Sequence, residues 1–215
     1  MSTAEVAVFD FDGTIIRGDS IVSLQQYALK RRCVSAFGVI RAVCCGALYH
    51  AHFMSAATAK KYSHAFLTRM TPEARESLLR SFAQSLVDRA YPPALKKLRE
   101  HHEHGDLVVI CSASCECYMQ YVAPLLDADT LLCTPSRPDG GMLGPNCRGE
   151  EKVRRVTQWL KEKGLPTDSI CAAYGDSAGD APVLRMSRHP VLVNPKPKLA
   201  KLMPGAEQVQ WSEEQ

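Results

Sequence analysis

The sequence has no pair of cysteines at CxxC spacing and no apolar leader at its start. Nine cysteines are scattered along the 215 residues, and without paired spacing they exclude a zinc ribbon. The first residues, MSTAEVAVFDFDGT, run from apolar into acidic positions instead of forming a signal-peptide core, so we do not expect export. Scattered thiols are typical of a reducing compartment, where cysteine acts as a small buried hydrophobe. We therefore expect a cytoplasmic protein.

An excess of charge of one sign is also missing. The chain has 26 Lys and Arg against 23 Asp and Glu, for a formal net charge of +3. This small excess of positive charge does not indicate a nucleic-acid partner. The hydrophobic share of 46% and charged share of 23% are typical of folded globular proteins. A chain of this length can bury enough apolar surface to fold without disulfides.

Four short apolar runs, each ending in polar residues, predict buried strands at residues 6–9, 107–111, 170–174 and 191–193. Helical patterns lie between them at residues 93–104, 114–126 and 150–163, with a short one from Gly179. Strands alternating with helices predict an α/β fold, a Rossmann-like doubly wound parallel sheet covered by helices on both faces. Ligands of such sheets bind at the carboxyl ends of the strands. We expect the proline-punctuated tail to run over the surface to Trp211.

Residues 19–90 break this alternation because they read as helical throughout. We predict an all-helical cap domain at 19–90, inserted into a catalytic core formed by 1–18 and 91–215. Within the cap, residues 33–49 carry one charge, Arg41, and follow Lys30-Arg31-Arg32. This run is short for a membrane span, which needs about 20 apolar residues. We favour a buried cap helix, with peripheral membrane or lipid contact and a true span as alternatives.

Acidic residues follow the first strand directly, in Asp10-Phe11-Asp12-Gly13-Thr14. Their spacing lets both carboxylates face one crevice at the sheet edge, although a turn with a helix cap would use the same residues. The second predicted strand is followed directly by Ser112, whose hydroxyl we expect at the same sheet edge, with Ser114 as the less favoured alternative. A hydroxyl there could cap the next helix or donate to a phosphoryl oxygen.

Two more carboxylates follow the predicted strand at 170–174, in Gly-Asp176-Ser-Ala-Gly-Asp180. With Asp10 and Asp12 they place four acids at one sheet edge, which is unfavourable without a cation. Hard oxygen ligands favour magnesium over zinc. Lys152 opens a helix in Gly-Glu-Glu-Lys, where by itself it would be a solvated surface lysine.

The motifs DFDGT, the strand-end Ser112, GEEK and GDSAGD occur in the order seen in the haloacid dehalogenase superfamily. The position of the cap resembles the phosphoserine-phosphatase-like branch of that superfamily. The resemblance implies that Asp10 is a nucleophile that forms an aspartyl-phosphate and that Asp12 is the general acid and base. It also implies a Mg²⁺ ion held by Asp10, the backbone carbonyl of Asp12 and Asp176, with Asp180 as a supporting ligand.

The same resemblance assigns phosphate binding to four residues, Gly13, Thr14, Ser112 and Lys152, and implies a magnesium-dependent phosphatase. Transport ATPases resemble this site but have threonine at the position of Asp12, and dehalogenases lack the second acid. A phosphomutase would keep the same residues and stays an alternative. A non-catalytic binding module is disfavoured because the motif residues are all present.

The sequence of the cap does not identify the substrate. In phosphoserine phosphatases the position seven after the second acid is a glutamate that reads the substrate amine, and here it is Asp19. A cap arginine for a substrate carboxylate cannot be chosen among Arg31, Arg32, Arg41 and Arg69. A small phosphorylated metabolite such as phosphoserine is one expectation. The apolar run instead resembles the caps of bacterial phosphatidylglycerophosphate phosphatases, so a lipid phosphate is the other. The sequence does not indicate an oligomeric state.

Two clusters look reactive but have plainer interpretations. The tract His101-His102-Glu103-His104 resembles a metal site, yet we expect it to form the surface end of a helix, where histidines complement the helix dipole. Cys115 and Cys117 follow Ser112 closely, and we expect them to pack in the next helix.

Overall fold

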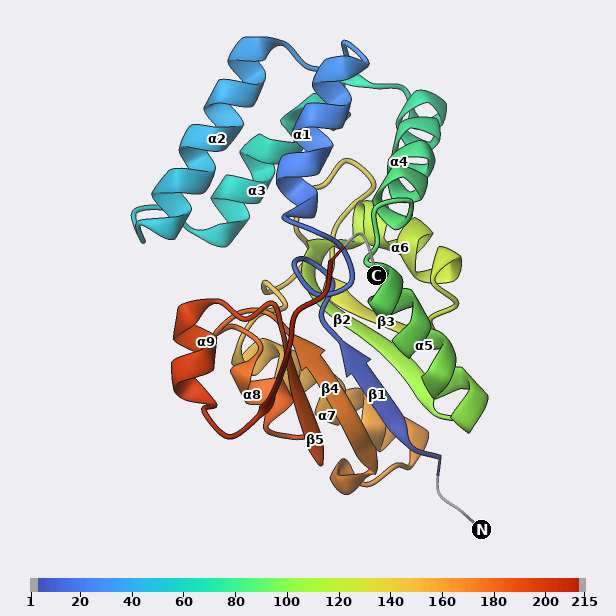
Figure 1. Ribbon diagram of the computed structural model, residues 1–215. Helices are drawn as coiled ribbons and strands as arrows, with labels where there is room; N and C mark the ends of the chain where they lie inside the picture. The colour runs from blue at the N-terminus through green and yellow to red at the C-terminus, as the bar shows by residue number, and fades with distance from the viewer. Residues whose placement is uncertain (1–3, 213–215) are drawn as a thin grey trace.

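The computed structural model describes residues 4–212, in which a parallel sheet lies below a group of helices (Figure 1). The sheet has six strands in the order β3-β2-β1-β4-β5-β6, and every neighbouring pair is parallel. The strands are β1 (Val6–Phe9), β2 (Leu107–Cys115), β3 (Thr130–Thr134), β4 (Ile170–Gly175), β5 (His189–Val193) and β6 (Glu207–Val209). β1 is central, between β2 and β4.

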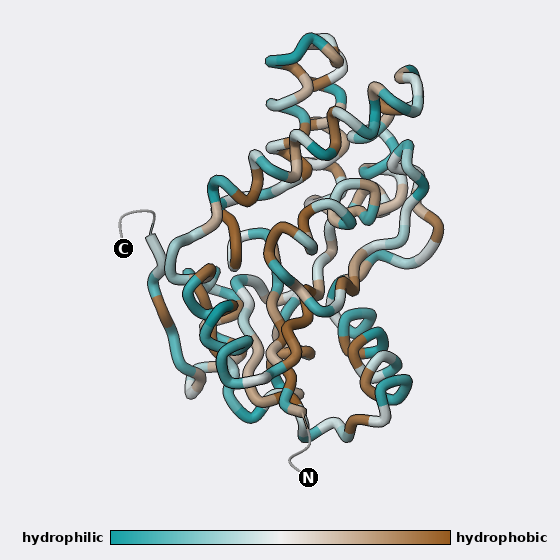
Figure 2. The backbone as a smooth tube through the Cα atoms, turned by 90° about the vertical axis from the view of Figure 1, so that its right-hand side faces the viewer, coloured by the Kyte–Doolittle hydropathy of each residue, from teal (hydrophilic) through white to brown (hydrophobic). Residues whose placement is uncertain are grey.

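Alternate residues of β1 enter two separate cores. Ala7 and Phe9 pack with α4 (Pro72–Val87), α5 (Pro92–His104) and α6 (Glu116–Leu125) on one face. Val6 and Val8 pack with α7 (Glu150–Lys163), α8 (Ala181–Leu184) and α9 (Pro197–Leu202) on the other. Figure 2 shows the hydrophobic colour along the inner strands and alternating colours along the outer helices. The predicted doubly wound α/β fold is confirmed.

The edges of the sheet differ from the prediction. β3 and β6 were not predicted, because β3 is half-exposed over most of its length and β6 has a single apolar residue. The tail is more ordered than expected, since it holds both α9 and β6. Trp211 packs against Tyr174, with their ring centroids 6.1 Å apart.

β2 continues four residues beyond the predicted end, to Cys115. Its register with β3 is irregular between Cys111 and Cys115. The expected helix start at Ser114 is therefore wrong, and α6 begins at Glu116. Cys115 lies in the strand rather than the helix, and Cys117 lies in the first turn of α6. Both are buried.

Two predicted helices of the core are closely confirmed. α5 and α7 end at Gly105 and Gly164, which both adopt the left-handed conformation that glycine favours. The histidine tract does form the last turn of α5, but its first residue is not on the surface. His101 is largely buried, and its ring nitrogens contact Asp106 at 2.7 Å and the Tyr174 hydroxyl at 2.9 Å.

Between β1 and α5 the chain forms α1 (Ser20–Lys30), α2 (Ala36–His50), α3 (Ala56–His64), a 3₁₀ turn at Ala65–Arg69, and α4. We call residues 20–87 the insertion. The side chains of Asp19, Ser35, Ser55 and Thr71 accept backbone N–H bonds at the starts of the four helices. The two connections to the core run together, because Ile16 pairs with Ala90 and the Tyr91 N–H donates to Ile15.

The favoured interpretation of residues 33–49 as a buried helix is wrong. α2 packs one face against α3, but Phe37, Ile40, Val43 and Leu48 on its outer side are exposed. Among residues 4–212, none of the helices combines the length and the apolar character that a membrane span requires.

Candidate active site

The site begins where β1 ends, at the carboxyl edge of the sheet. The Asp10 N–H continues the ladder by donating to the Tyr174 carbonyl at 2.9 Å. The chain then turns at Gly13, whose φ of +83° suits glycine. A Cβ on Gly13 would lie 2.3 Å from Asp176 Oδ2, so the missing side chain lets the turn after β1 approach the end of β4. Asp10 and Asp176 therefore come together, as the motifs predict.

Lys152 is the buried cation of the site and not a surface residue. Its ammonium donates to Asp10 Oδ1 at 2.6 Å and to Asp180 Oδ1 at 2.7 Å. Its side chain is 2% exposed, so the Coulomb attraction in these ion pairs is screened much less by water than in surface pairs. Burial lowers the pKa of Lys152, but Asp10 and Asp180 raise it further, and the net pKa lies well above its usual value. Lys152 therefore stays charged.

Three buried carboxylates, those of Asp10, Asp176 and Asp180, have oxygen atoms within 4.8 Å of one another. Burial and the nearby Asp180 raise the pKa of Asp10 to about 8, although Lys152 lowers it. Burial also raises the pKa of Asp176, against the effect of Lys196. The two lysines therefore do not fully neutralise the three carboxylates. The atoms that these carboxylates offer to a metal ion are all hard oxygens. This chemistry fits the predicted Mg²⁺, for which Asp10, Asp176 and Asp180 could supply ligands.

Asp12 lies in a different environment, held by hydroxyls. Its Oδ2 accepts hydrogen bonds from Ser114 and, at 3.0 Å, from Ser20, and the Ser20 N–H donates to Oδ1 at 2.7 Å. The Ser20 hydroxyl also lies 2.8 Å from the Tyr118 hydroxyl. Burial and the charge of Asp19 raise the pKa of Asp12 to about 6, although the serine hydrogen bonds lower it. The carboxyl can therefore hold or release a proton near neutral pH.

The structure separates the roles of the two strand-end serines. Ser112 is buried, and its Oγ accepts the Ser114 N–H at 3.0 Å, which leaves the hydroxyl hydrogen to be donated elsewhere. Ser114, the less favoured candidate, contacts Asp12. Ser20 and Tyr118 were not predicted as site residues. Ser20 is a hydroxyl residue in the first turn of α1 and Tyr118 an aromatic residue of α6, and neither belongs to a motif that would indicate a functional role.

The remaining two predicted phosphate ligands already have partners. The Thr14 hydroxyl donates to Asp10 Oδ2 at 3.3 Å, and the Gly13 N–H donates to the Ile16 carbonyl at 2.8 Å. In this arrangement they shape the turn that presents Asp10. Their assignment to phosphate binding stays a prediction.

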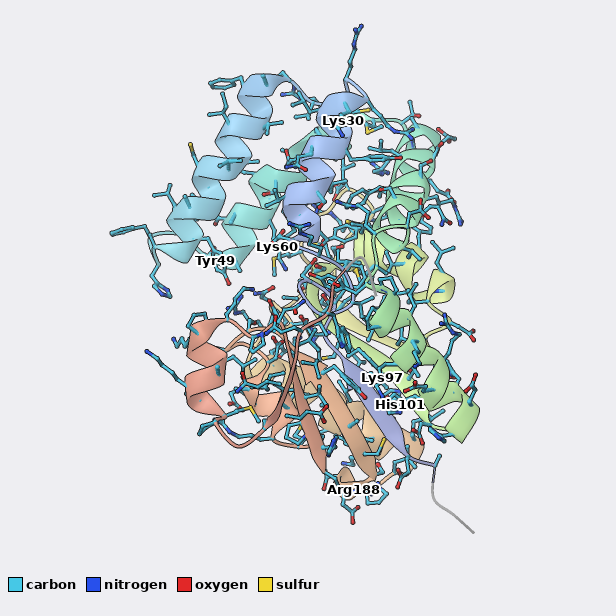
Figure 3. All side chains as sticks on the ribbon, in the orientation of Figure 1. Lys30, Tyr49, Lys60, Lys97, His101 and Arg188 are labelled. Carbon is cyan, nitrogen blue, oxygen red and sulfur yellow. The ribbon has the colours of Figure 1, made fainter. Side chains whose placement is uncertain are left out.

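Two lysines near the site were missed. Lys60 comes from α3, and its buried ammonium donates to the Ala113 carbonyl, to Thr134 Oγ1 at 3.1 Å and to Asn146 Oδ1 at 2.6 Å. It joins the insertion to the ends of β2 and β3 (Figure 3). Lys196 donates to Asp176 Oδ2 at 2.6 Å, from a largely exposed side chain. Neither lysine belongs to a motif, so no local pattern singles it out.

Comparison with known proteins identifies the family to which these motifs belong. Residues 7–185 match the family described as haloacid dehalogenase-like hydrolase. The chain is 27% identical to a histidinol-phosphatase of Neisseria meningitidis serogroup C (strain 8013), over 91% of this chain and 93% of the relative.

Solved structures show the same fold. A protein of unknown function from Bordetella pertussis Tohama I superimposes with a TM-score of 0.85 at 23% identity, covering 97% of this chain and 99% of that one. A phosphoserine phosphatase, described as a phospho-aspartyl intermediate analogue, superimposes with a TM-score of 0.67 at 15% identity, covering 96% and 93%.

Proposed function

The chain belongs to the haloacid dehalogenase-like hydrolase family, and from this premise we propose that it is a magnesium-dependent phosphatase that hydrolyses a phosphate monoester through an aspartyl-phosphate on Asp10. The observation that carries the proposal is the pairing of two unlike carboxyls. The Asp10 carboxylate accepts a hydrogen bond from the Lys152 ammonium and lies near other carboxylates. Asp12, two residues away, accepts hydrogen bonds from hydroxyl groups. Two carboxyls in different surroundings are suited to two roles.

In the proposed first step, an Asp10 oxygen attacks phosphorus and the ester oxygen leaves. Lys152 holds Asp10 in position and offsets negative charge on the phosphoryl oxygens. The Ser112 hydroxyl, on the neighbouring strand β2, supplies a donor. Mg²⁺ bound by Asp10, Asp176 and the Asp12 carbonyl, with Asp180 in support, would supply charge neutralisation for the phosphoryl group.

Asp12 handles the proton in both steps. In its neutral form it gives a proton to the departing alkoxide, and as a carboxylate it then takes one from the water that hydrolyses the aspartyl-phosphate. A pKa of about 6 allows both forms near neutral pH. Ser20 and Ser114 fix the orientation of the carboxyl, so they are positioning residues.

For the substrate we infer a phosphorylated amino alcohol. Histidinol phosphate and phosphoserine, the substrates that the names of the relative and of the structural neighbour indicate, both combine a phosphate ester with a nearby amine. Asp19 caps α1 with its Oδ1, and its charge acts on Asp12. A carboxylate at this place could also receive a substrate amine.

The test is phosphate release from histidinol phosphate, phosphoserine, a sugar phosphate and phosphatidylglycerophosphate, each with Mg²⁺ and with EDTA. We expect Mg²⁺-dependent release of phosphate, fastest from an amino alcohol ester. Isomerised ester without free phosphate would instead indicate a phosphomutase, and preference for the lipid would overturn the amino alcohol assignment.

The intermediate is tested separately. Acid-quenched enzyme should carry one phosphoryl group on the peptide that contains Asp10, detected by mass spectrometry, and Asp10→Asn should not. Turnover with no such adduct under single-turnover conditions, or an adduct on another residue, would contradict the aspartyl-phosphate.

A further inference from the structure

The helix α2 is apolar on both of its sides. On the inner side Ala42 and Cys45 are buried against neighbouring helices. On the outer side Phe37 is 74% exposed, and Ile40 and Leu48 are exposed as well. The turn that follows α2 adds Phe53, which is 83% exposed. α2 is the outermost helix of the insertion in Figure 1, with α3 and α1 beside it.

The exposed side chains form a continuous stripe and not scattered positions. Residues 37, 40, 44 and 48 follow the spacing of one helix face, and all four are apolar or cysteine. A helix at a protein surface ordinarily turns polar residues outward. The only charged residue of α2 is Arg41. Large exposed apolar patches of this kind mark interaction surfaces.

The charged residues of the segment that carries this stripe have one sign. Residues 20–72 contain seven lysines and arginines and no aspartate or glutamate, whereas the rest of the chain has 19 basic and 23 acidic residues. Of these seven, Lys60 is buried at the core, but Lys30, Arg41 and Lys61 are exposed, as are the neighbouring arginines at 31, 32 and 69. The segment that carries the apolar stripe therefore has six exposed basic residues and no acidic one.

We propose that the outer face of α2 docks on an anionic lipid bilayer, with Phe37 and Phe53 entering the interface and the basic residues contacting lipid headgroups. An apolar helix face with lysine and arginine beside it is the chemistry of interfacial membrane binding. At about 1.5 Å per residue, the 15 residues of α2 span about 22 Å, which allows the helix to lie along the surface. The proposal concerns binding and does not rest on the proposed catalytic activity.

Other occupants fit less well. A second copy of this chain would bring the same positive surface against itself, without an acidic residue in the segment to pair with it. Two surface hollows, one between α5 and α6 and one between α3 and the loop after β3, contain no residue of α2, so neither offers a groove for a peptide on this face.

The experiment is co-sedimentation of the full chain with vesicles of phosphatidylcholine containing one third phosphatidylglycerol, and with pure phosphatidylcholine. We expect binding to the anionic vesicles that weakens as salt is raised from about 50 to 500 mM, because screening shortens the range of the attraction. Phe37→Ser/Ile40→Ser should reduce partitioning about tenfold or more, since each removes apolar area that enters the interface. Lys30→Gln/Lys61→Gln should weaken binding to anionic vesicles alone.

Matched controls replace similar residues elsewhere. Leu125→Ser/Leu143→Ser removes exposed leucines outside the insertion, and Lys96→Gln/Lys97→Gln removes lysines from α5, on the other side of the molecule from α2 (Figures 1 and 3). Both should bind as the unsubstituted chain does, and all variants should keep the same circular dichroism. The proposal fails if the chain stays in the supernatant at low salt, if the α2 variants bind like their controls, or if sedimentation velocity shows a dimer that Phe37→Ser/Ile40→Ser dissociates.

Discussion

Asp10 and Asp12 show how the same residue type acquires different chemistry from its surroundings. Asp10 shares the Lys152 ammonium with Asp180, so its oxygen is held in place by a fixed charge. Asp12 has hydroxyl and amide donors instead, and burial keeps its proton available up to about pH 6. Neither difference can be seen in the letters DFDGT. Both arise because other elements bring Lys152, Ser20 and Ser114 to the end of β1.

Replacing Asp10 with asparagine tests the nucleophile. The amide is nearly the same size but cannot attack phosphorus, so kcat with any phosphate ester should fall at least a thousandfold. The fold should survive, because Lys152 keeps its ion pair with Asp180. Circular dichroism and Mg²⁺-dependent phosphate release are the measurements. A purified Asp10→Asn protein with near-normal turnover would disprove the role of Asp10.

The raised pKa of Asp12 predicts how the rate depends on pH. The assay is run at saturating Mg²⁺, whose charge would offset the neighbouring acids that raise the pKa of Asp10 and so keep Asp10 ionised. Above about pH 6 the protonated fraction of Asp12 then falls about tenfold per pH unit, so kcat/KM for an alkyl phosphate should fall as pH rises. An aryl ester such as p-nitrophenyl phosphate has a leaving group that hardly needs a proton, and its rate should fall much less. Asp12→Asn should remove this difference in pH dependence. Parallel pH profiles for the two esters with the unsubstituted enzyme would contradict proton donation by Asp12.

Among the elements, α3 makes a buried polar connection between the insertion and the sheet. Lys60 spans from α3 to Ala113, Thr134 and Asn146. One turn later His64 packs against Gly140, where any Cβ would collide with the imidazole. α3 is thus held at two successive turns, close to the strand ends that form the site.

Lys60→Met should loosen α3 without abolishing the fold. Thr134 still bonds the Ala113 carbonyl and Asn146, so only part of the polar network loses its partner. We expect a loss of about 1–3 kcal/mol in the free energy of unfolding and faster hydrogen exchange in α3, with exchange in β1 and β4 unchanged. Lys61→Gln, a change at the exposed next residue, is the control. Equal exchange rates in the two variants would show that Lys60 does not secure α3.

Sequence patterns predicted the elements that local chemistry defines. β1 and β4 are short buried runs followed by acids, and α5 and α7 end at glycines that must be left-handed, so each can be recognised without its neighbours. β3 and the end of β2 could not be predicted, because they exist through pairing with each other across an irregular register. The exposed face of α2 was missed for a similar reason, since composition shows that a helix is apolar but not how many of its sides have partners.

The candidate site divides in the same way. Residues within motifs, such as Asp10 and Lys152, could be predicted, whereas Lys60 and Lys196 could not. These two lysines reach the site from α3 and from the segment before α9, and only the tertiary fold makes them neighbours of the carboxylates.

In the whole molecule, charge is distributed unevenly along the chain, and the net charge alone does not show this. A net charge of +3 is the sum of a wholly basic stretch at residues 20–72 and an acidic remainder. At the centre of that remainder lie Asp10, Asp176 and Asp180, which repel one another and are buried. Burial raises the pKa values of Asp10 and Asp176, so their charges oppose folding unless a cation accompanies them, and metal binding and stability should be linked.

Mg²⁺ should therefore raise the melting temperature as well as the activity. At about 100 times its Kd, a ligand that binds only the folded state adds about 2.7 kcal/mol, which for a chain of this size is roughly 5–10 °C. Asp176→Asn should lose most of this increase, because it removes a ligand oxygen charge, whereas Asp168→Asn, at an exposed position, should keep it. Thermal unfolding followed by circular dichroism with Mg²⁺ and with EDTA makes the measurement. If both variants respond to Mg²⁺ as the unsubstituted chain does, the cation does not bind at this cluster; if only Asp176→Asn fails to respond, the carboxylates that oppose folding are the ones that hold the metal.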